Sequence, residues 1–162
     1  MDIDRAELCF SQVHDMPIMG RPLVEALRQL IRKADRSIMI CSCEFTGSTN
    51  FILNEEITKQ LQRGREVTVY GNHSSQMTRL KATYGDMGLR SFYWIPPKQK
   101  SLFHIKAITV DGNMAYIGSA NLSPNAMGNS AEWGLISHSP DLCSELEQYI
   151  AELTQTGRFV EV

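Results

Sequence analysis

The sequence predicts an α/β fold, in which a mixed, largely parallel β-sheet is flanked by helices on both faces. In the first hundred residues, short apolar runs alternate with longer segments whose apolar residues recur at helical spacing. Two further strand-like runs then lie on either side of Asp111-Gly112-Asn113, a turn sequence typical of an antiparallel hairpin. Because 162 residues is the usual size of one domain, we expect residues 1–162 to fold as a single unit.

The N-terminal half is expected to alternate four strands with three helices. The strands cover residues 9–13, 37–45, 66–70 and 91–95, and the apolar centre of the second is typical of a strand covered on both faces. The first helix opens at Arg21-Pro22, with Pro at the first helical position. The second follows a polar loop at residues 46–50, begins near Ile52 and ends at Arg63-Gly64, a helix-stop signal. The third covers residues 74–84.

The C-terminal half changes pattern. Strands are expected over residues 105–110, 114–117 and 132–137, and a closing helix begins at Pro140. Its apolar face is formed by Leu142, Leu146, Ile150 and Leu153. Strand–helix alternation followed by a hairpin favours a mixed sheet with helices on both sides.

Composition narrows the possible functions. The chain has 16 Lys and Arg against 18 Asp and Glu, so its net charge of -2 predicts no general attraction to nucleic acid or anionic membrane. No apolar run reaches the roughly 20 residues that span a bilayer, and the N-terminus lacks the pattern of a secretory leader. The four cysteines lack zinc-site spacing, so we expect buried, reduced thiols in a cytoplasmic protein.

Chemistry is concentrated between residues 103 and 136. In a strand that begins at His104, Lys106 lies on the same face, about 7 Å along the strand. Burying an imidazole beside an ammonium is costly unless a negative group lies between them, and a phosphate is the obvious candidate. The alternative is that both side chains lie on the solvated face of an edge strand.

The neighbouring residues favour the phosphate. Gly118 allows close approach of the backbone to a ligand, and Ser119 and Asn121 add neutral hydrogen-bonding groups. Glu132 begins a later strand and could orient a histidine nucleophile. These groups are what an attack on a phosphodiester needs.

This pattern resembles the signature of the phospholipase D superfamily, His-x-Lys-x4-Asp-x6-Gly-Ser-x-Asn, followed by an acidic residue. The matching residues are His104, Lys106, Asp111, Gly118, Ser119, Asn121 and Glu132. The resemblance implies one phospholipase D-like catalytic domain that uses no metal and no other cofactor. It also implies that His104 forms a phosphohistidine, that Lys106 and Asn121 bind the phosphate oxygens with support from Ser119, and that Glu132 orients His104. We expect Asp111 to be structural, bonding the turn amides around Gly112-Asn113.

The family's enzymes use two such motifs, whereas this chain has one His-x-Lys. We therefore expect a homodimer with two copies of His104 facing across the two-fold axis. Substrate binding is expected from a segment free of Asp and Glu, which contains Arg90, Lys98 and Lys100 with Trp94 interleaved. His73 is a further candidate, because it lies in a loop after a strand.

The function predicted from these features is a metal-independent phosphodiesterase, a nuclease acting on DNA or RNA. Short single-motif members that resemble this chain include bacterial endonucleases, together with a mitochondrial-surface nuclease or lipase. One alternative keeps the chemistry with a phospholipid substrate, although no basic amphipathic helix favours membrane binding. Another is a phosphate or nucleic-acid binding module without turnover.

Overall fold

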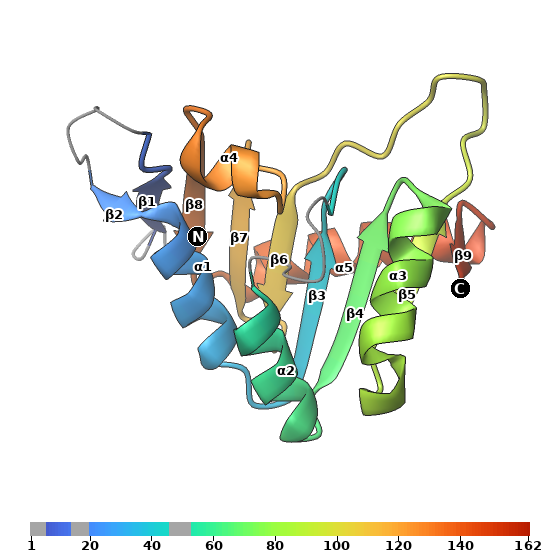
Figure 1. Cartoon of the computed structure of the whole chain (residues 1–162), viewed down its shortest axis with the longest axis horizontal. Coiled ribbons are helices and arrows are strands. Elements are labelled where there is room, and N and C mark those ends of the chain that lie inside the picture. Colours follow the sequence, from blue (N-terminus) through green and yellow to red (C-terminus); the bar gives the residue numbers. More distant parts are fainter. Residues whose placement is uncertain (1–5, 14–19, 46–52) are drawn as a thin grey trace.

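The computed structural model describes residues 6–13, 20–45 and 53–162, which form one sheet between two helical layers (Figure 1). Within these ranges the sheet has nine strands in the order β2-β1-β8-β7-β6-β3-β4-β5-β9. They are β1 (Ala6–Phe10), β2 (Arg21–Pro22), β3 (Ser37–Cys41), β4 (Glu66–Gly71), β5 (Arg90–Trp94), β6 (Ala107–Val110), β7 (Met114–Gly118), β8 (Trp133–Ser137) and β9 (Phe159–Glu161). The helices are α1 (Leu23–Arg32), α2 (Asn54–Gln62), α3 (Ser74–Tyr84), α4 (Pro124–Gly128) and α5 (Pro140–Gln155), with a 3-10 turn η1 (Gly85–Met87).

The mixed α/β sheet is confirmed. β3, β4 and β5 are parallel neighbours, as expected for strands joined through the crossover helices α2 and α3. β6, β7 and β8 form an antiparallel set, which joins the parallel strands through the antiparallel β3–β6 pair. β1 and β9 add antiparallel pairings at the two sides, so parallel pairing is less extensive than expected.

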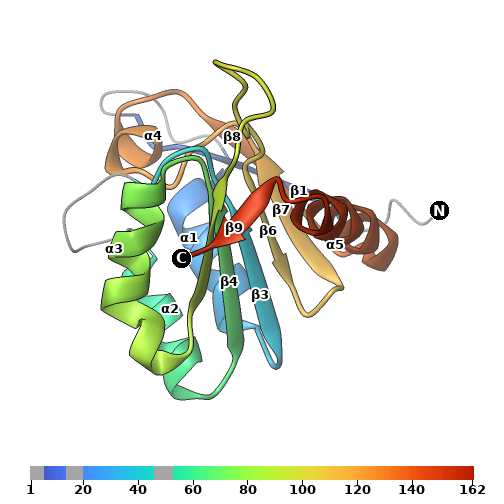
Figure 2. The same cartoon turned by 90° about the vertical axis from the view of Figure 1, so that its right-hand side faces the viewer.

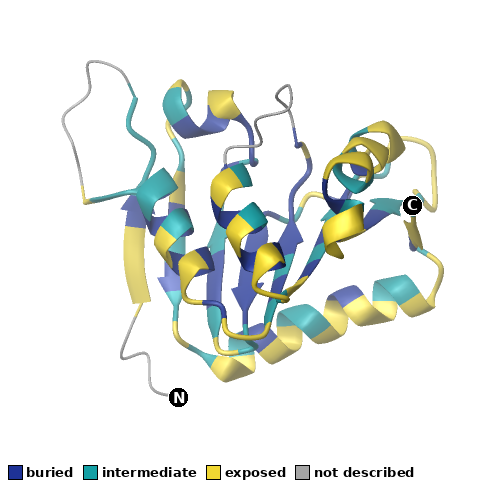
Figure 3. Cartoon of the chain, turned by 60° about the horizontal axis from the view of Figure 1, so that its bottom comes forward, coloured by how far each residue is buried: buried dark blue, intermediate teal, exposed yellow. Residues whose placement is uncertain are grey.

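Helices cover both faces, as predicted (Figure 2). α1, α2 and α3 pack on one face over a core that includes Leu27, Ile31, Ile57 and the strand residues Ile40 and Val69. α5 covers the other face through Ile150, with Leu146 and Leu153 packing against the same cluster. Figure 3 shows the resulting pattern, in which the sheet is largely buried and the outer faces of the helices are exposed.

Several boundaries differ from the sequence-based ones. β1 begins at Ala6, before the expected start, and Pro22 is the N-cap of α1 instead of its first helical residue. β3 ends at Cys41, four residues early. β6 begins at Ala107, so His104 and Lys106 precede the strand. The expected loop at residues 46–50 and the residue Ile52 lie outside the described residues.

The short elements β2, β9, α4 and η1 were not predicted. β9 has three residues, too few for a periodic signal, yet Phe159 is buried against the α5-side cluster. The four cysteines are buried and free. In the ranges that the structure describes, no helix has the length and apolar character to cross a membrane.

Candidate active site at one edge of the sheet

Segments that are distant in sequence meet where β3 ends. Cys41, the last residue of β3, pairs with Ala107 at the start of β6. Ala107 also pairs with Ile117 near the end of β7, and the end of β7 lies opposite the start of β8. Residues before β6, after β7 and before β8 therefore share this edge of the sheet. They include His104, Lys106, Ser119, Asn121 and Glu132.

His104 and Lys106 are in contact just before β6. The imidazole is exposed, whereas Lys106 is only 8% exposed. Lys106 Nζ lies 3.2 Å from His104 Nδ1 and 3.3 Å from Nε2. The Lys106 ammonium is thus almost equally far from the two ring nitrogens. If it lay in the plane of the ring, it would collide with Cε1, the carbon between the nitrogens. The ammonium therefore lies over a face of the imidazole ring. The in-plane bonding directions of both nitrogens therefore remain free of Lys106.

Lys106 is a buried cation without an anionic partner among the described residues. Its ammonium donates to the His104 carbonyl at 3.1 Å and to Cys43 Sγ at 3.2 Å. None of the ion pairs between described residues includes Lys106. Burying an uncompensated charge is costly, which makes this ammonium a suitable binding group for an anion.

Ser119 and Glu132 form a second group at the same edge. Ser119 Oγ donates to Glu132 Oε2 and accepts a hydrogen bond from the Trp133 amide at 3.1 Å. Among the described residues Glu132 thus bonds Ser119 and not His104, which differs from the expected pairing. Asn121 Oδ1 is buried, with no hydrogen-bond partner in the described part of the chain. The Asn121 amide oxygen is therefore a polar group that this part of the chain leaves unsatisfied.

Gly118 has a packing role that the sequence did not reveal. A Cβ at Gly118 would lie 2.3 Å from the Tyr116 hydroxyl and 2.6 Å from the Trp133 carbonyl. A Cβ at Gly134, its partner on β8, would lie 2.1 Å from Tyr116 Cε2. The two glycines thus form a slot for the Tyr116 ring, and burial raises the pKa of its phenol. The absence of a Cβ at Gly118 therefore makes room for Tyr116, a role in addition to the expected close approach of the backbone to a ligand.

Asp111 lies at the opposite end of β6. Its carboxylate accepts hydrogen bonds from the amides of Asp35 at 2.8 Å, Arg36 at 2.8 Å and Ser37 at 2.9 Å. The partners are thus the amides at the start of β3, and not those of the hairpin turn as expected. Burial raises the pKa of this carboxyl, but the three amides outweigh that effect and hold the pKa below its usual value.

Two of the expected substrate-binding residues are engaged elsewhere. Arg90 begins β5, about 13 Å before the end of the strand, and forms two 2.9 Å hydrogen bonds with Glu161. Trp94 is half-buried, packs on Phe103 and Phe159, and donates from Nε1 to the Ser101 carbonyl at 3.3 Å. Arg90 therefore lies away from the site edge, and Trp94 supports a loop.

The other three candidates are exposed on loops or at a helix N-cap. Lys98 and Lys100 are exposed on the loop between β5 and β6, which projects beyond the sheet before it leads into β6 (Figure 1). His73 is exposed and is the N-cap residue of α3, two residues after the end of β4. All three lie on connections that begin where the parallel strands end.

Sequence reasoning missed Asn72 and Cys43, which hold the backbone just before His104. The Asn72 side chain accepts from the Phe103 N–H at 2.8 Å and donates to the Phe103 carbonyl at 2.6 Å. Cys43 Sγ donates to the same carbonyl at 3.1 Å. Their positions just after parallel strands were the one available signal, because such loops often line sites in α/β sheets.

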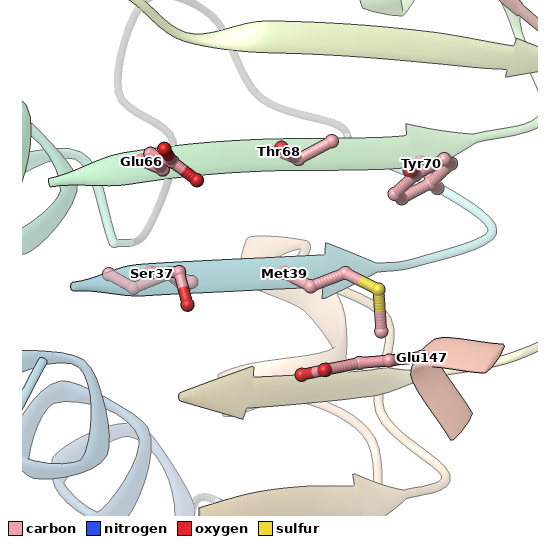
Figure 4. A pocket seen from close by; sticks show the side chains of 7 residues that line it. Ser37, Met39, Glu66, Thr68, Tyr70 and Glu147 are labelled. Carbon is pink, nitrogen blue, oxygen red and sulfur yellow. The ribbon is translucent and has the colours of Figure 1, made fainter. Parts of the chain in front are cut away.

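Two hollows lie away from these residues. One, of about 210 Å³, opens on the α5 side of β3 and β4, where Figure 4 shows Glu66 and Glu147 beside Met39, Thr68 and Tyr70. A larger hollow of about 690 Å³ also contains both glutamates and lies beside Asp111. Because carboxylates line both hollows, their negative charge disfavours binding of a phosphate there. Across residues 6–13, 20–45 and 53–162, no group of three or more His, Cys, Asp or Glu could hold a metal ion.

Comparisons with known proteins identify the family and the fold. A family model described as cardiolipin synthase, PLD-like domain, matches residues 27–154. Nuc from Salmonella typhimurium, described as a phospholipase D family member, is 16% identical with a TM-score of 0.75, over 98% of this chain and 97% of Nuc. NucT from Helicobacter pylori is 20% identical with a TM-score of 0.72, over 86% of this chain and 90% of NucT.

Phosphatidylserine synthase from Haemophilus influenzae is 16% identical with a TM-score of 0.76, over 97% of this chain but 39% of the synthase. No curated protein matches significantly. At these identities the solved structures establish the fold alone, whereas the family match covers well over half of the chain. The chain therefore belongs to the phospholipase D superfamily, whose members are phosphodiesterases or nucleases.

Proposed function

We propose that this protein is a metal-independent phosphodiesterase that cleaves nucleic acid through a covalent phosphohistidine on His104. The observation that carries the proposal is the exposed His104 imidazole in contact with the buried, uncompensated ammonium of Lys106. A phosphodiester supplies the negative charge that the Lys106 ammonium lacks. It also supplies an electrophilic phosphorus atom that the His104 imidazole can attack.

In the first step, a His104 ring nitrogen attacks phosphorus and the bond to the leaving oxygen breaks. Lys106 stabilises the charge that develops on the non-bridging oxygens, and the side-chain NH2 of Asn121 adds a hydrogen bond. The one hydroxyl proton of Ser119 is donated to Glu132, so Ser119 supports the site through that carboxylate. In the second step, water attacks the phosphohistidine and releases the second product and the free imidazole. Ser119 holds one oxygen of Glu132, which leaves Oε1 to accept a hydrogen bond from an imidazole N–H.

The leaving oxygen needs a proton from a general acid. The single motif of this chain supplies one histidine, which already serves as the nucleophile. We propose a homodimer in which His104 of one protomer is the nucleophile while the partner's copy acts as acid and then as base. Random mixing of wild-type and His104→Ala chains at equal ratio should then leave about a quarter of the dimers active. Retention of about half the activity would mean that each chain works alone.

A nucleic-acid substrate is favoured by the exposed Lys98 and Lys100, on the loop that leads into His104. Cations beside a phosphate site increase affinity for a polyanionic strand. Nuc and NucT, which this chain matches over 97% and 90% of their lengths, are two structural neighbours of similar size. The likeness to phosphatidylserine synthase keeps a phospholipid phosphodiester as the second candidate.

The deciding experiment incubates the protein in excess EDTA with labelled single- and double-stranded DNA and RNA, and with phosphatidylcholine and cardiolipin vesicles. We expect cleavage of a nucleic acid, its loss in His104→Ala, and its retention in His138→Ala, a matched control because His138 is an exposed histidine just after β8. Cleavage that disappears with chelator and returns with Mg²⁺ would contradict the mechanism. Hydrolysis of vesicle lipid alone would favour the phospholipid candidate, and binding without turnover would favour a binding module.

A further inference from the structure

The side chain of Asn72 makes a two-way connection to a single residue of another segment. Asn72 follows β4, and its Oδ1 accepts from the Phe103 N–H at 2.8 Å while its Nδ2 donates to the Phe103 carbonyl at 2.6 Å. This pair of bonds has the pattern of two residues that exchange N–H and C=O bonds in an antiparallel sheet. The amide thus takes the place of a neighbouring strand for the Phe103 backbone.

The segment it holds has no strand ladder of its own. The chain leaves β5 through an exposed loop and has no regular structure from residue 95 until β6 begins at residue 107. Phe103 is buried among Trp94 and Phe159, but apolar packing has little directional preference. The two Asn72 bonds, in contrast, fix the orientation of the peptide that leads directly into His104.

Asn72 also reaches the group that contacts the Lys106 ammonium. Its Nδ2 lies 3.3 Å from the Cys43 carbonyl. Cys43 Sγ in turn donates to the Phe103 carbonyl at 3.1 Å and accepts from Lys106 Nζ at 3.2 Å. One side-chain amide therefore links the backbone before the nucleophile with the residue that supports the phosphate-binding cation.

We propose that Asn72 is a positioning residue for His104 and Lys106, acting through the Phe103 backbone and Cys43. This inference rests on the proposed function. Asn72 makes none of its contacts with the imidazole or the ammonium, so its loss should displace these groups without removing them. Because reaction rates depend on sub-ångström placement of the nucleophile, the loss should lower kcat much more than it raises KM.

The experiment compares Asn72→Ala and Asn72→Asp with wild type on bis(p-nitrophenyl) phosphate in EDTA. Asn72→Asp conserves shape and can still accept from the Phe103 N–H, but it cannot donate to the two carbonyls. We expect kcat to fall about 10- to 100-fold in both variants. KM should stay within about twofold of wild type, since the phosphate-binding groups remain present.

Gln60→Ala is the matched control for a general loss of stability. Gln60 is a buried amide whose Nε2 donates to the Ile31 carbonyl at 3.0 Å, in the contact between α2 and α1. This variant should melt at a lower temperature with kcat unchanged. A folded Asn72→Asp protein with wild-type kcat would overturn the proposal. So would failure of both Asn72 variants to fold, because Asn72 would then hold the fold and not the nucleophile.

The outcomes also separate this proposal from the proposed function. If wild type does not cleave the substrate, or if His104→Ala cleaves it as fast, the proposed function fails and the role of Asn72 falls with it. If wild type is active, His104→Ala is inactive and the Asn72 variants keep wild-type kcat, only the positioning role is refuted. An imidazole resonance of His104 that shifts in Asn72→Asp while that of His138 does not would support the proposal independently of turnover.

Discussion

Replacing Asp111 with Ala tests whether this residue stabilises the fold at a distance from the chemistry. Its carboxylate accepts three amide hydrogen bonds of 2.8 to 2.9 Å from the segment that begins β3. The Asp111 backbone has a φ of 56°, a left-handed conformation that Asp tolerates better than Ala. The substitution therefore removes three bonds and adds backbone strain.

The magnitude follows from these two terms. A hydrogen bond to a charged group contributes about 1.5–3 kcal/mol, so three bonds have an upper limit of about 9 kcal/mol. Asp35 and Arg36 are exposed, so water can replace the carboxylate at their amides and recover most of that energy. With about 1 kcal/mol of strain for Ala, we expect a net loss of about 2–4 kcal/mol. That loss would lower the melting temperature by roughly 5–15 °C for a domain of this size.

The assay is thermal melting of wild type, Asp111→Ala and Asp111→Asn as a function of pH, with kcat measured well below the melting temperature. Because the folded state lowers the pKa of this carboxyl, its contribution is complete above the ordinary value of 3.8. The stability advantage of wild type over Asp111→Asn should therefore be constant near neutral pH. It should shrink as the pH falls below that value towards the folded-state pKa. An Asp111→Ala protein that melts like wild type but has lost activity would refute the structural role.

Three further substitutions test the packing around Tyr116, the charge of Lys106 and the position of Arg90. Gly134→Ala should lower the free energy of unfolding by about 1–3 kcal/mol, measured by melting, because the new Cβ would lie 2.1 Å from Tyr116 Cε2. Adding Tyr116→Leu to the same chain should recover part of that stability. Equal losses with and without Tyr116→Leu would contradict the packing of Tyr116 between Gly118 and Gly134. Lys106→Met should lower kcat/KM about 100-fold or more without lowering the melting temperature, since it removes an uncompensated buried charge. Arg90→Ala should lose less than about 1 kcal/mol with its exposed Glu161 pair and cleave nucleic acid like wild type; a tenfold slower cleavage would place Arg90 in the site.

The sequence predicted those parts of the fold that depend on local patterns. α3 was expected at its observed residues, and the hairpin between β6 and β7 follows from the turn sequence at Asp111-Gly112-Asn113. What it missed depends on tertiary contacts. β9 forms because Phe159 is buried beside Phe92 and Phe103, which no pattern over three residues can report.

The site shows the same division. The spacing of His104 and Lys106 predicted two side chains on one face of a strand, about 7 Å apart along it. In the structure neither residue belongs to β6, and Lys106 Nζ lies 3.2 Å from His104 Nδ1. Glu132 was expected on His104, and in the structure its Oε2 accepts a hydrogen bond from Ser119, a partner that the sequence spacing alone did not indicate. Asn72 was not identified, since an Asn after a strand is common in loops and its bond to Phe103 spans 31 residues of sequence.

Trapping the covalent intermediate tests most directly whether His104 is the nucleophile. Wild-type protein is mixed with bis(p-nitrophenyl) phosphate in EDTA, quenched in alkali within the first turnover, digested and analysed by mass spectrometry. We expect a p-nitrophenyl phosphoryl adduct on the peptide that contains His104, together with a burst of about one p-nitrophenolate per dimer. Turnover with no burst and no adduct, or an adduct on a different residue, would contradict this expectation.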